Sequence, residues 1–264
     1  PLCFLEDFNN FEKWSSKKLL PLNPKIIFSS FLLWKNSLSQ YYIAKKTEEG
    51  TKLIYRQHGA NFGAVEYATG EVHEKKACDK FLTWGWVEDK DKSKIEKSGV
   101  RFLKIKKTTK KVKKIIVTLR SRKRHVQTIA IGAYGTIRYT DYIKFSQKFL
   151  LSLNENVVKK ITLRFPPHIK DYNSQDFYNV LGDKFNQDNN QSFYDLILDD
   201  NFFLHTNHST AFLETLAHNC PTIGVWDDKD FFLKKEYSKF YEEMKRVGII
   251  HTDTIKAKNF INEL

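Results

Sequence analysis

The chain has 264 residues, of which 41% are hydrophobic and 14% aromatic, and it carries a net charge of +13. This length and apolar content are enough for one large or two modest buried cores, so the composition excludes a disordered chain. The longest apolar stretch, residues 26–34, is too short to span a bilayer and no signal-peptide pattern is present, so we expect a soluble protein.

The positive charge is concentrated in one segment. Of the 44 basic residues, 12 lie between Arg101 and His125, where there is no carboxylate, and the rest of the chain is close to balanced by its 31 acidic residues. Such a segment is a solvated linker, or it binds an anionic membrane surface or nucleotide phosphates, and the sequence leaves these alternatives open.

Cysteine usage indicates the compartment. Cys3, Cys78 and Cys220 have no zinc-site spacing and suggest no disulfide framework, so we expect a reducing cytoplasm, with peripheral contact at the inner membrane face through the basic segment. Because the chain begins with Pro1 in the middle of a pattern, we also expect that an amino-terminal portion is missing.

The first half of the chain predicts a strand, helix and strand in succession. Residues 24–31 form an apolar strand, residues 37–49 a helix that ends at Gly50, and residues 52–56 a second strand that runs into Gln57-His58-Gly59. Strands that alternate with helices of this length indicate a parallel sheet, whose functional groups gather at the carboxyl ends of the strands. The Gln-His-Gly turn lies at such an end.

A charged, weakly periodic region separates two alternations. Residues 71–79 predict a short helix and residues 80–86 a strand, and residues 87–114 then predict a domain boundary or a mobile loop. We therefore expect an amino-terminal domain over residues 1–100 and a carboxyl-terminal domain over residues 101–264.

The second alternation predicts another parallel sheet. Its strands are predicted at residues 114–119, 160–164, 202–205, 222–225 and 249–251, and its helices at residues 141–153, 209–218, 231–247 and 254–263. The fold class is α/β with two Rossmann-like parallel-sheet domains, of which the amino-terminal one is incomplete.

A polar turn at His205–Ser209 joins a strand to a helix. Ser209 and Thr210 can cap that helix, and the exposed amides of its first turn favour a phosphate or a carboxylate. Glu214 lies on the same side as Thr210 and can reach a ribose hydroxyl. The alternative is a capped helix whose Glu214 faces water.

Two sets of residues resemble known families. The serine and threonine followed by Glu-x-Leu-Ala-x-Asn-x-Pro-Thr-Ile, at residues 209–223, resemble the donor-binding helix of GT-B glycosyltransferases. Gln57-His58-Gly59-Ala60-Asn61-Phe62-Gly63, with Glu71, Glu74, Asp79 and Thr83-Trp84-Gly85-Trp86, is similar to a bacterial family of surface-carbohydrate transferases. Capsule Kdo transferases and CDP-glycerol glycerophosphotransferases are similar at a greater distance. The resemblance covers residues 24–250.

This resemblance implies an acceptor site around the Gln-His-Gly turn. It makes His58 the candidate general base, supported by Glu71, while Gln57, Gly59, Asn61 and Glu74 line the acceptor side or the cleft. The alternatives are a histidine that satisfies the backbone of a tight turn and, since Glu71 and Glu74 are three residues apart on a short helix, a solvated pair of carboxylates.

The resemblance also implies a donor site. Arg164 and His168 lie where CMP- and CDP-using transferases carry a His-Pro motif, but the order Pro-Pro-His departs from that motif. The remaining donor-site candidates are Arg120, followed by a loop with Arg122, Lys123 and Arg124, and His205, Ser209, Thr210 and Glu214. A cationic loop can neutralise a leaving diphosphate without a metal.

We therefore expect an inverting glycosyltransferase that needs no metal and no cofactor besides its sugar nucleotide, with CMP- or CDP-linked donors favoured. The chain contains no Asp-x-Asp motif, which disfavours a metal-dependent design. The acceptor is a surface polysaccharide, a glycoconjugate or a lipid-linked carbohydrate. The alternatives are a non-catalytic or truncated remnant that only binds sugar nucleotide, and a nucleic-acid-binding protein, for which no recognition motif is present.

Overall fold

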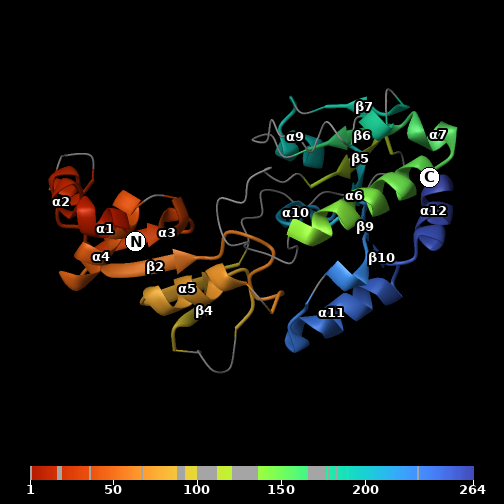
Figure 1. Ribbon diagram of the computed structural model, residues 1–264. Helices are drawn as coiled ribbons and strands as arrows, with labels where there is room; N and C mark the ends of the chain where they lie inside the picture. The colour runs from red at the N-terminus through yellow and green to blue at the C-terminus, as the bar shows by residue number, and fades with distance from the viewer. Residues whose placement is uncertain are drawn as a thin grey trace. The chain divides into compact units, whose positions relative to one another are not determined.

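The computed structural model describes residues 2–16, 20–35, 37–66, 68–87, 93–99, 112–120, 136–165, 177, 179–181, 184–188, 190–230 and 232–264. The chain divides into two compact units, each with a parallel sheet (Figure 1). The first unit comprises Pro1–His58 and Thr69–Val100, and the second comprises Gly59–Ala68 and Arg101–Leu264. The sequence-based boundary after residue 100 stays a prediction, and these units depart from it in the segment Gly59–Ala68.

The sheet of the first unit has its strands in chain order, all parallel. They are β1 (Ile26–Ser29), β2 (Lys52–Arg56), β3 (Lys80–Thr83) and β4 (Ile95–Lys97). Alternate residues of these strands, such as Leu53, Tyr55 and Phe81, are buried. The helices are α1 (Leu2–Glu6), α2 (Phe8–Ser16), α3 (Leu32–Lys35), α4 (Ser37–Glu48) and α5 (Thr69–Ala77).

One part of the predicted boundary region was assigned wrongly. β4 lies within residues 87–114, where the sequence predicts a boundary or a mobile loop. Its three residues show no periodicity of their own, but Ile95 is buried and pairs with Phe81 of β3. Pairing with a neighbouring strand therefore decided the conformation, which local pattern alone cannot reveal.

The sheet of the second unit has the strand order β7-β6-β5-β8-β9-β10, and all of its pairs are parallel. The strands are β5 (Lys114–Thr118), β6 (Ile161–Arg164), β7 (Asn186–Gln187), β8 (Asn201–His205), β9 (Thr222–Val225) and β10 (Ile250–His251). The chain builds outward from β5 to β7 and then returns to the other side of β5 at β8. This is the Rossmann order, and its switch point lies between β5 and β8.

Helices and the core of the second unit follow the predicted alternation. The helical elements are α6 (Thr136–Leu151), α7 (Glu155–Val158), α9 (Phe193–Leu198), α10 (Thr210–Ala217), the 3-10 turn η3 (Asp228–Asp230), α11 (Lys235–Arg246) and α12 (Thr254–Asn262). Central strands are buried on both faces, as parallel strands are, and Val117, Phe149 and Leu204 lie in their core. The two Rossmann-like parallel sheets that the sequence predicts are thus confirmed.

Most of the basic segment Arg101–His125 lies outside the described residues, so its alternatives stay open. Among the residues that the structure describes, none of the helices has the length and apolar character needed to cross a membrane.

Candidate functional site

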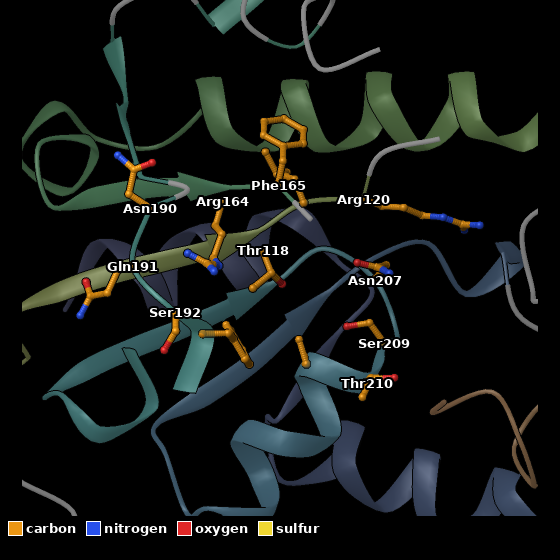
Figure 2. Close-up of a pocket in the computed structure, with 13 residues that line it drawn as sticks. Thr118, Arg120, Arg164, Phe165, Asn190, Gln191, Ser192, Asn207, Ser209 and Thr210 are labelled. Atoms are coloured by element: carbon orange, nitrogen blue, oxygen red, sulfur yellow. The ribbon is translucent and has the colours of Figure 1, made fainter. Parts of the chain in front are cut away.

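A pocket of about 600 Å³ lies in the second unit at the carboxyl ends of β5, β6 and β8 (Figure 2). It is lined by Thr118, Leu119, Arg120, Arg164, Phe165, Asn190, Gln191, Ser192, Phe193, Asn207, Ser209, Thr210 and Ala211. Ligands of Rossmann-like sheets bind outside the carboxyl ends of the strands at the switch point, so the topology alone indicates that this pocket is a ligand-binding site.

The register of three neighbouring strands places Arg164 and the turn after β8 at opposite ends of the pocket. Thr118 pairs with Arg164 of β6 on one side and with His205 of β8 on the other. Neighbouring strands lie about 4.8 Å apart, so Arg164 and the turn after β8 start from positions roughly 10 Å apart. Figure 2 shows Thr118 between Arg164 and the Ser209–Thr210 turn.

The first end of the pocket is the amino terminus of α10. Ser209 caps the helix, and its hydroxyl accepts a hydrogen bond from the Phe212 amide at 3.4 Å. The amides of Thr210 and Ala211 lie in the first turn and have no acceptor within the helix. Both residues line the pocket. These amides and the positive end of the helix dipole favour an anion here.

The second end of the pocket contains a buried cation. The Arg164 side chain belongs to a residue that is only 7% exposed, and Nη1 donates one long hydrogen bond, 3.5 Å, to the Asp188 backbone oxygen. Among the described residues no carboxylate forms an ion pair with it. Burial lowers the pKa of the guanidinium, and the nearby Asp188 charge opposes this effect. Within the described residues most donors of this buried guanidinium have no acceptor, so a ligand that supplies acceptor atoms would be favoured here.

Beneath the pocket, His205 is fully buried and held by two threonines. Thr215 Oγ1 donates to the Phe212 carbonyl at 2.9 Å, so it accepts from His205 Nε2 at the same distance. Nδ1 is then unprotonated and accepts from the Thr118 hydroxyl at 2.7 Å. Burial lowers the pKa of His205 to about 3, so the ring is neutral. His205 does not line the pocket, and it positions Thr118, whose Oγ1 can then only accept from a ligand.

A second network holds the loop after β5. The Arg120 amide donates to Tyr142 Oη at 2.7 Å, and Tyr139 Oη donates to the Arg120 carbonyl at 3.0 Å. Thr206 Oγ1 in turn donates to the Thr118 carbonyl and contacts Tyr142 Oη. The backbone of Arg120, a residue that lines the pocket, is thereby held in place, and Figure 2 shows its side chain extending away from the other labelled residues.

Glu214 lies one turn into α10 and is partly buried. Burial raises the pKa of its carboxyl group, and His218 opposes this shift. Within the described part of the chain no hydrogen bond reaches its side-chain oxygens. Hydrogen bonds from ligand hydroxyls would stabilise a partly buried carboxylate of this kind.

The segment Gly59–Ala68 packs on this same unit as a strap. The Ala60 amide donates to Thr210 Oγ1 at 3.3 Å. Further along, Glu66 N donates to Phe232 O at 2.8 Å and Lys234 N donates to Ala64 O at 2.9 Å. The strap thus brings the predicted residues Gly59 and Asn61 into the second unit, with Gly59 directly beside Thr210.

The first unit contains the other group of predicted residues. His58 follows β2, and its Nδ1 lies 3.6 Å from Oε1 of the fully buried Glu74. Phe31 contacts the imidazole edge to face, with ring centres 5.0 Å apart. Burial lowers the pKa of His58, and a hydrogen bond to the Ser30 backbone opposes this effect. The imidazole is therefore neutral at pH 7, the state that a general base requires.

The two glutamates of α5 are buried at 2% and 0% exposure, so the alternative of a solvated pair was wrong. Glu71 forms an ion pair with Lys75 at 3.2 Å, whereas Glu74 is the one that approaches His58. Gln57 is also buried, and its Oε1 accepts from Trp84 N at 3.0 Å and from Trp86 Nε1 at 2.7 Å. It holds the ends of β2 and β3 together.

Some predicted donor residues cannot be located. His168, Arg122, Lys123 and Arg124 lie outside the described residues. Conversely, the sequence pattern did not point to Thr118, Asn190, Gln191, Phe193 or Asn207, which line the pocket. Thr118 ends a predicted strand and could have been found from that position, but the loop after β7 carries no recognisable motif. In the part of the chain that the structure describes, no group of three or more histidine, cysteine, aspartate or glutamate side chains is arranged to hold a metal ion.

Two Rossmann-like units and a pocket at the switch point define an α/β protein of the class that binds ligands at the carboxyl ends of parallel strands. The chain belongs to the LIC12162 family, whose model, described as LIC12162 family transferase, matches residues 1–264. Its fold is similar to that of the S. aureus MnaA–UDP co-structure, with a TM-score of 0.52 and 10% identity over 98% of this chain and 71% of that chain. At this identity the likeness shows the fold alone. No curated protein matches the sequence significantly.

Proposed function

We propose that the protein is a metal-independent, inverting glycosyltransferase that transfers a sugar from a CMP- or CDP-linked donor to a surface polysaccharide or glycoconjugate acceptor. The observation that carries this proposal is the pocket at the switch point, which combines the amino terminus of α10 with the buried cation Arg164. Membership in a transferase family and a fold shared with a UDP-bound protein support it. The preference for cytidine nucleotides rests on the family resemblance of the sequence.

In this proposal the donor phosphate binds at the amino terminus of α10. The Thr210 and Ala211 amides and the Ser209 hydroxyl are aimed at negative charge, which grows on the leaving phosphate as the glycosidic bond breaks. Glu214 accepts hydrogen bonds from the ribose hydroxyls. Arg120 adds a positive charge at the pocket edge, so that no metal ion is needed to stabilise the leaving group.

The acceptor is activated by His58. Its neutral imidazole takes the proton of the acceptor hydroxyl while that oxygen attacks the anomeric carbon, and the bond from that carbon to the nucleotide phosphate breaks. Glu74, 3.6 Å from Nδ1, stabilises the imidazolium that forms. Direct displacement of this kind inverts the anomeric configuration.

The experiment is a thermal-shift series with CMP, CDP, UDP, GDP and their sugar conjugates on the wild-type chain, Glu214→Ala and Glu263→Ala. A ligand that binds only the folded state raises the melting temperature by mass action. We expect a cytidine nucleotide to stabilise the wild type and the exposed-site control Glu263→Ala equally, and Glu214→Ala much less.

Transfer itself is then measured with the stabilising donor and a carbohydrate acceptor. His58→Gln should bind donor like the wild type and transfer no sugar. Donor binding without transfer by the wild type would favour a non-catalytic remnant. The absence of any nucleotide effect would refute the proposed function.

A further inference from the structure

The donor pocket has a second end, whose chemistry differs from that of the phosphate end. The Arg164 guanidinium lies at the end of the pocket opposite the amino terminus of α10 (Figure 2). Its Nη1 reaches the Asp188 carbonyl, beyond β7, and its Cζ lies 5.9 Å from the centre of the Phe193 ring. Figure 2 shows the guanidinium on the side of Asn190, Gln191 and Ser192, with Ser209 and Thr210 across the pocket. The arginine is therefore turned away from the site that suits a phosphate.

Arg164 is also the group that can discriminate at this end. The backbone amides of Asn190 and Gln191 donate hydrogen bonds to Asp188 Oδ1 at 2.9 and 3.3 Å. The Ser192 hydroxyl donates to Asp195 Oδ2 and accepts from the Asp195 backbone amide. The side-chain amides of Asn190 and Gln191 each carry a donor and an acceptor, so they adapt to either kind of ligand atom. A guanidinium only donates, and it does so as a rigid planar fork.

An arginine fork beside an aromatic ring suits a planar ligand group that carries acceptor atoms. The phosphate end lies roughly two strand spacings away, so this group is the part of the nucleotide remote from its phosphates. The part in question is the base. A fork that donates two hydrogen bonds fits a base edge with two adjacent acceptors. Cytosine offers N3 and O2, and guanine offers N7 and O6. Uracil has a donor between its two carbonyl groups, and adenine has an amino donor beside each ring nitrogen acceptor of its outer edges.

We propose that Arg164 reads the base of the donor nucleotide and selects a base with two adjacent acceptors, cytosine or guanine, over uracil and adenine. The inference rests on the proposed function, which supplies a nucleotide ligand. It differs from the expectation drawn from the sequence, in which Arg164 touches the nucleotide phosphate.

The test is calorimetric titration of the full chain with CDP, GDP, UDP, ADP and inorganic pyrophosphate. We expect the wild type to bind CDP or GDP roughly 10-fold or more tightly than UDP and ADP, the scale of one bidentate contact to a base. Which of the two binds more tightly identifies the base. Arg164→Lys keeps the charge and loses the fork, so it should reduce the favoured affinity to the level of UDP and leave pyrophosphate unchanged.

Two matched variants complete the design. Arg246→Lys alters an exposed arginine of the same unit and should change nothing. If Arg164→Lys does not fold, as judged by its unliganded melting curve, Phe193→Leu replaces it. That variant should weaken all four nucleotides and spare pyrophosphate, and unchanged nucleotide affinity would overturn the placement of the base.

The outcomes separate this inference from the proposed function. Equal losses for all nucleotides and pyrophosphate in Arg164→Lys would show that the arginine binds phosphate, and tightest binding of UDP or ADP by the wild type would show that it does not select the base as proposed. Either result overturns the inference and leaves a nucleotide site in place. Wild-type protein that binds none of the five ligands would overturn the proposed function as well.

Discussion

At the scale of single residues, the floor of the pocket depends on one hydroxyl. The Thr118 hydroxyl donates to Nδ1 of His205, which is fully buried and has no access to water. In Thr118→Val the shape is kept and that nitrogen loses its donor. We expect the free energy of unfolding to fall by about 1–3 kcal/mol, the cost of a buried polar atom left unsatisfied. Urea denaturation at pH 7 measures it.

Thr118→Ser is the control for this prediction, because it retains the hydroxyl and removes only a methyl group. It should lose less stability than Thr118→Val. If the valine variant were as stable as the wild type, the Thr118–His205 hydrogen bond would contribute nothing, and the assignment of the Nε2-protonated tautomer would lose its support.

The sequence predicted some residues of the site correctly and missed the environment of others. Ser209, Thr210 and Arg164 were singled out, and all three line one pocket. The burial of Glu71 and Glu74 was missed, because on a nine-residue helix two carboxylates three positions apart look the same whether they face water or the interior. Only the packing of α5 on its sheet decides between these cases.

At the scale of elements, the amino terminus of α10 combines a structural task with a binding task. Ser209 caps the helix and lines the pocket, and two substitutions separate these roles. Ser209→Ala removes the cap and should lower the free energy of unfolding by about 1 kcal/mol. Ser209→Asp keeps an acceptor at the cap, so its stability should match the wild type, but its negative charge should abolish stabilisation by pyrophosphate.

Both quantities come from melting curves recorded with and without pyrophosphate. The result that would contradict an anion site is an unchanged pyrophosphate effect in Ser209→Asp. Ser209→Asp is expected to have the melting temperature of the wild type without ligand, so a loss of pyrophosphate binding in this variant cannot be attributed to unfolding.

The strap Gly59–Ala68 shows what element-level prediction could not reach. The Gln-His-Gly turn was placed correctly at the end of a strand, but the residues after it pair with Leu233 and Thr210, more than 140 positions later in the chain. Contacts with residues so far away in the chain cannot be predicted from the local sequence. The loop after β7 is a similar case, since its place in the pocket follows from strand order and not from any motif.

At the scale of the whole molecule, alternation of apolar strands and helices was enough to predict two parallel sheets. Strands β2 and β9 were located at their observed limits, β2 from its alternation of apolar and polar residues and β9 from a short apolar run that follows a proline. Helix limits were less certain: α6 begins at Thr136, five residues before the predicted start, and α11 is shorter than predicted. Strand order, which creates the switch point, could not be read from the sequence because pairing is a property of the assembled sheet.

The stability of the molecule should depend on pH. Burial lowers the pKa of His205 to about 3 and that of His208 to about 4, against an ordinary value of 6.5. The unfolded chain therefore binds more protons than the folded one below pH 6.5. The free energy of unfolding is then fully present above pH 6.5 and should fall as the pH drops from 6.5 toward 4, by up to about 1.4 kcal/mol per pH unit for each histidine. Asp79 and Asp188, whose pKa values are also lowered, add to the loss only below about pH 4.

Urea denaturation at half-unit pH steps measures this slope. Burial also lowers the pKa of His58 and His251, so His208→Gln removes one of four such histidines and should reduce the slope between pH 6.5 and 4.5 by the share of that one group. A free energy of unfolding that stays flat across this range would mean that the buried imidazoles accept protons without cost. In that case the neutral, hydrogen-bonded His205 could not be what positions Thr118 beneath the pocket.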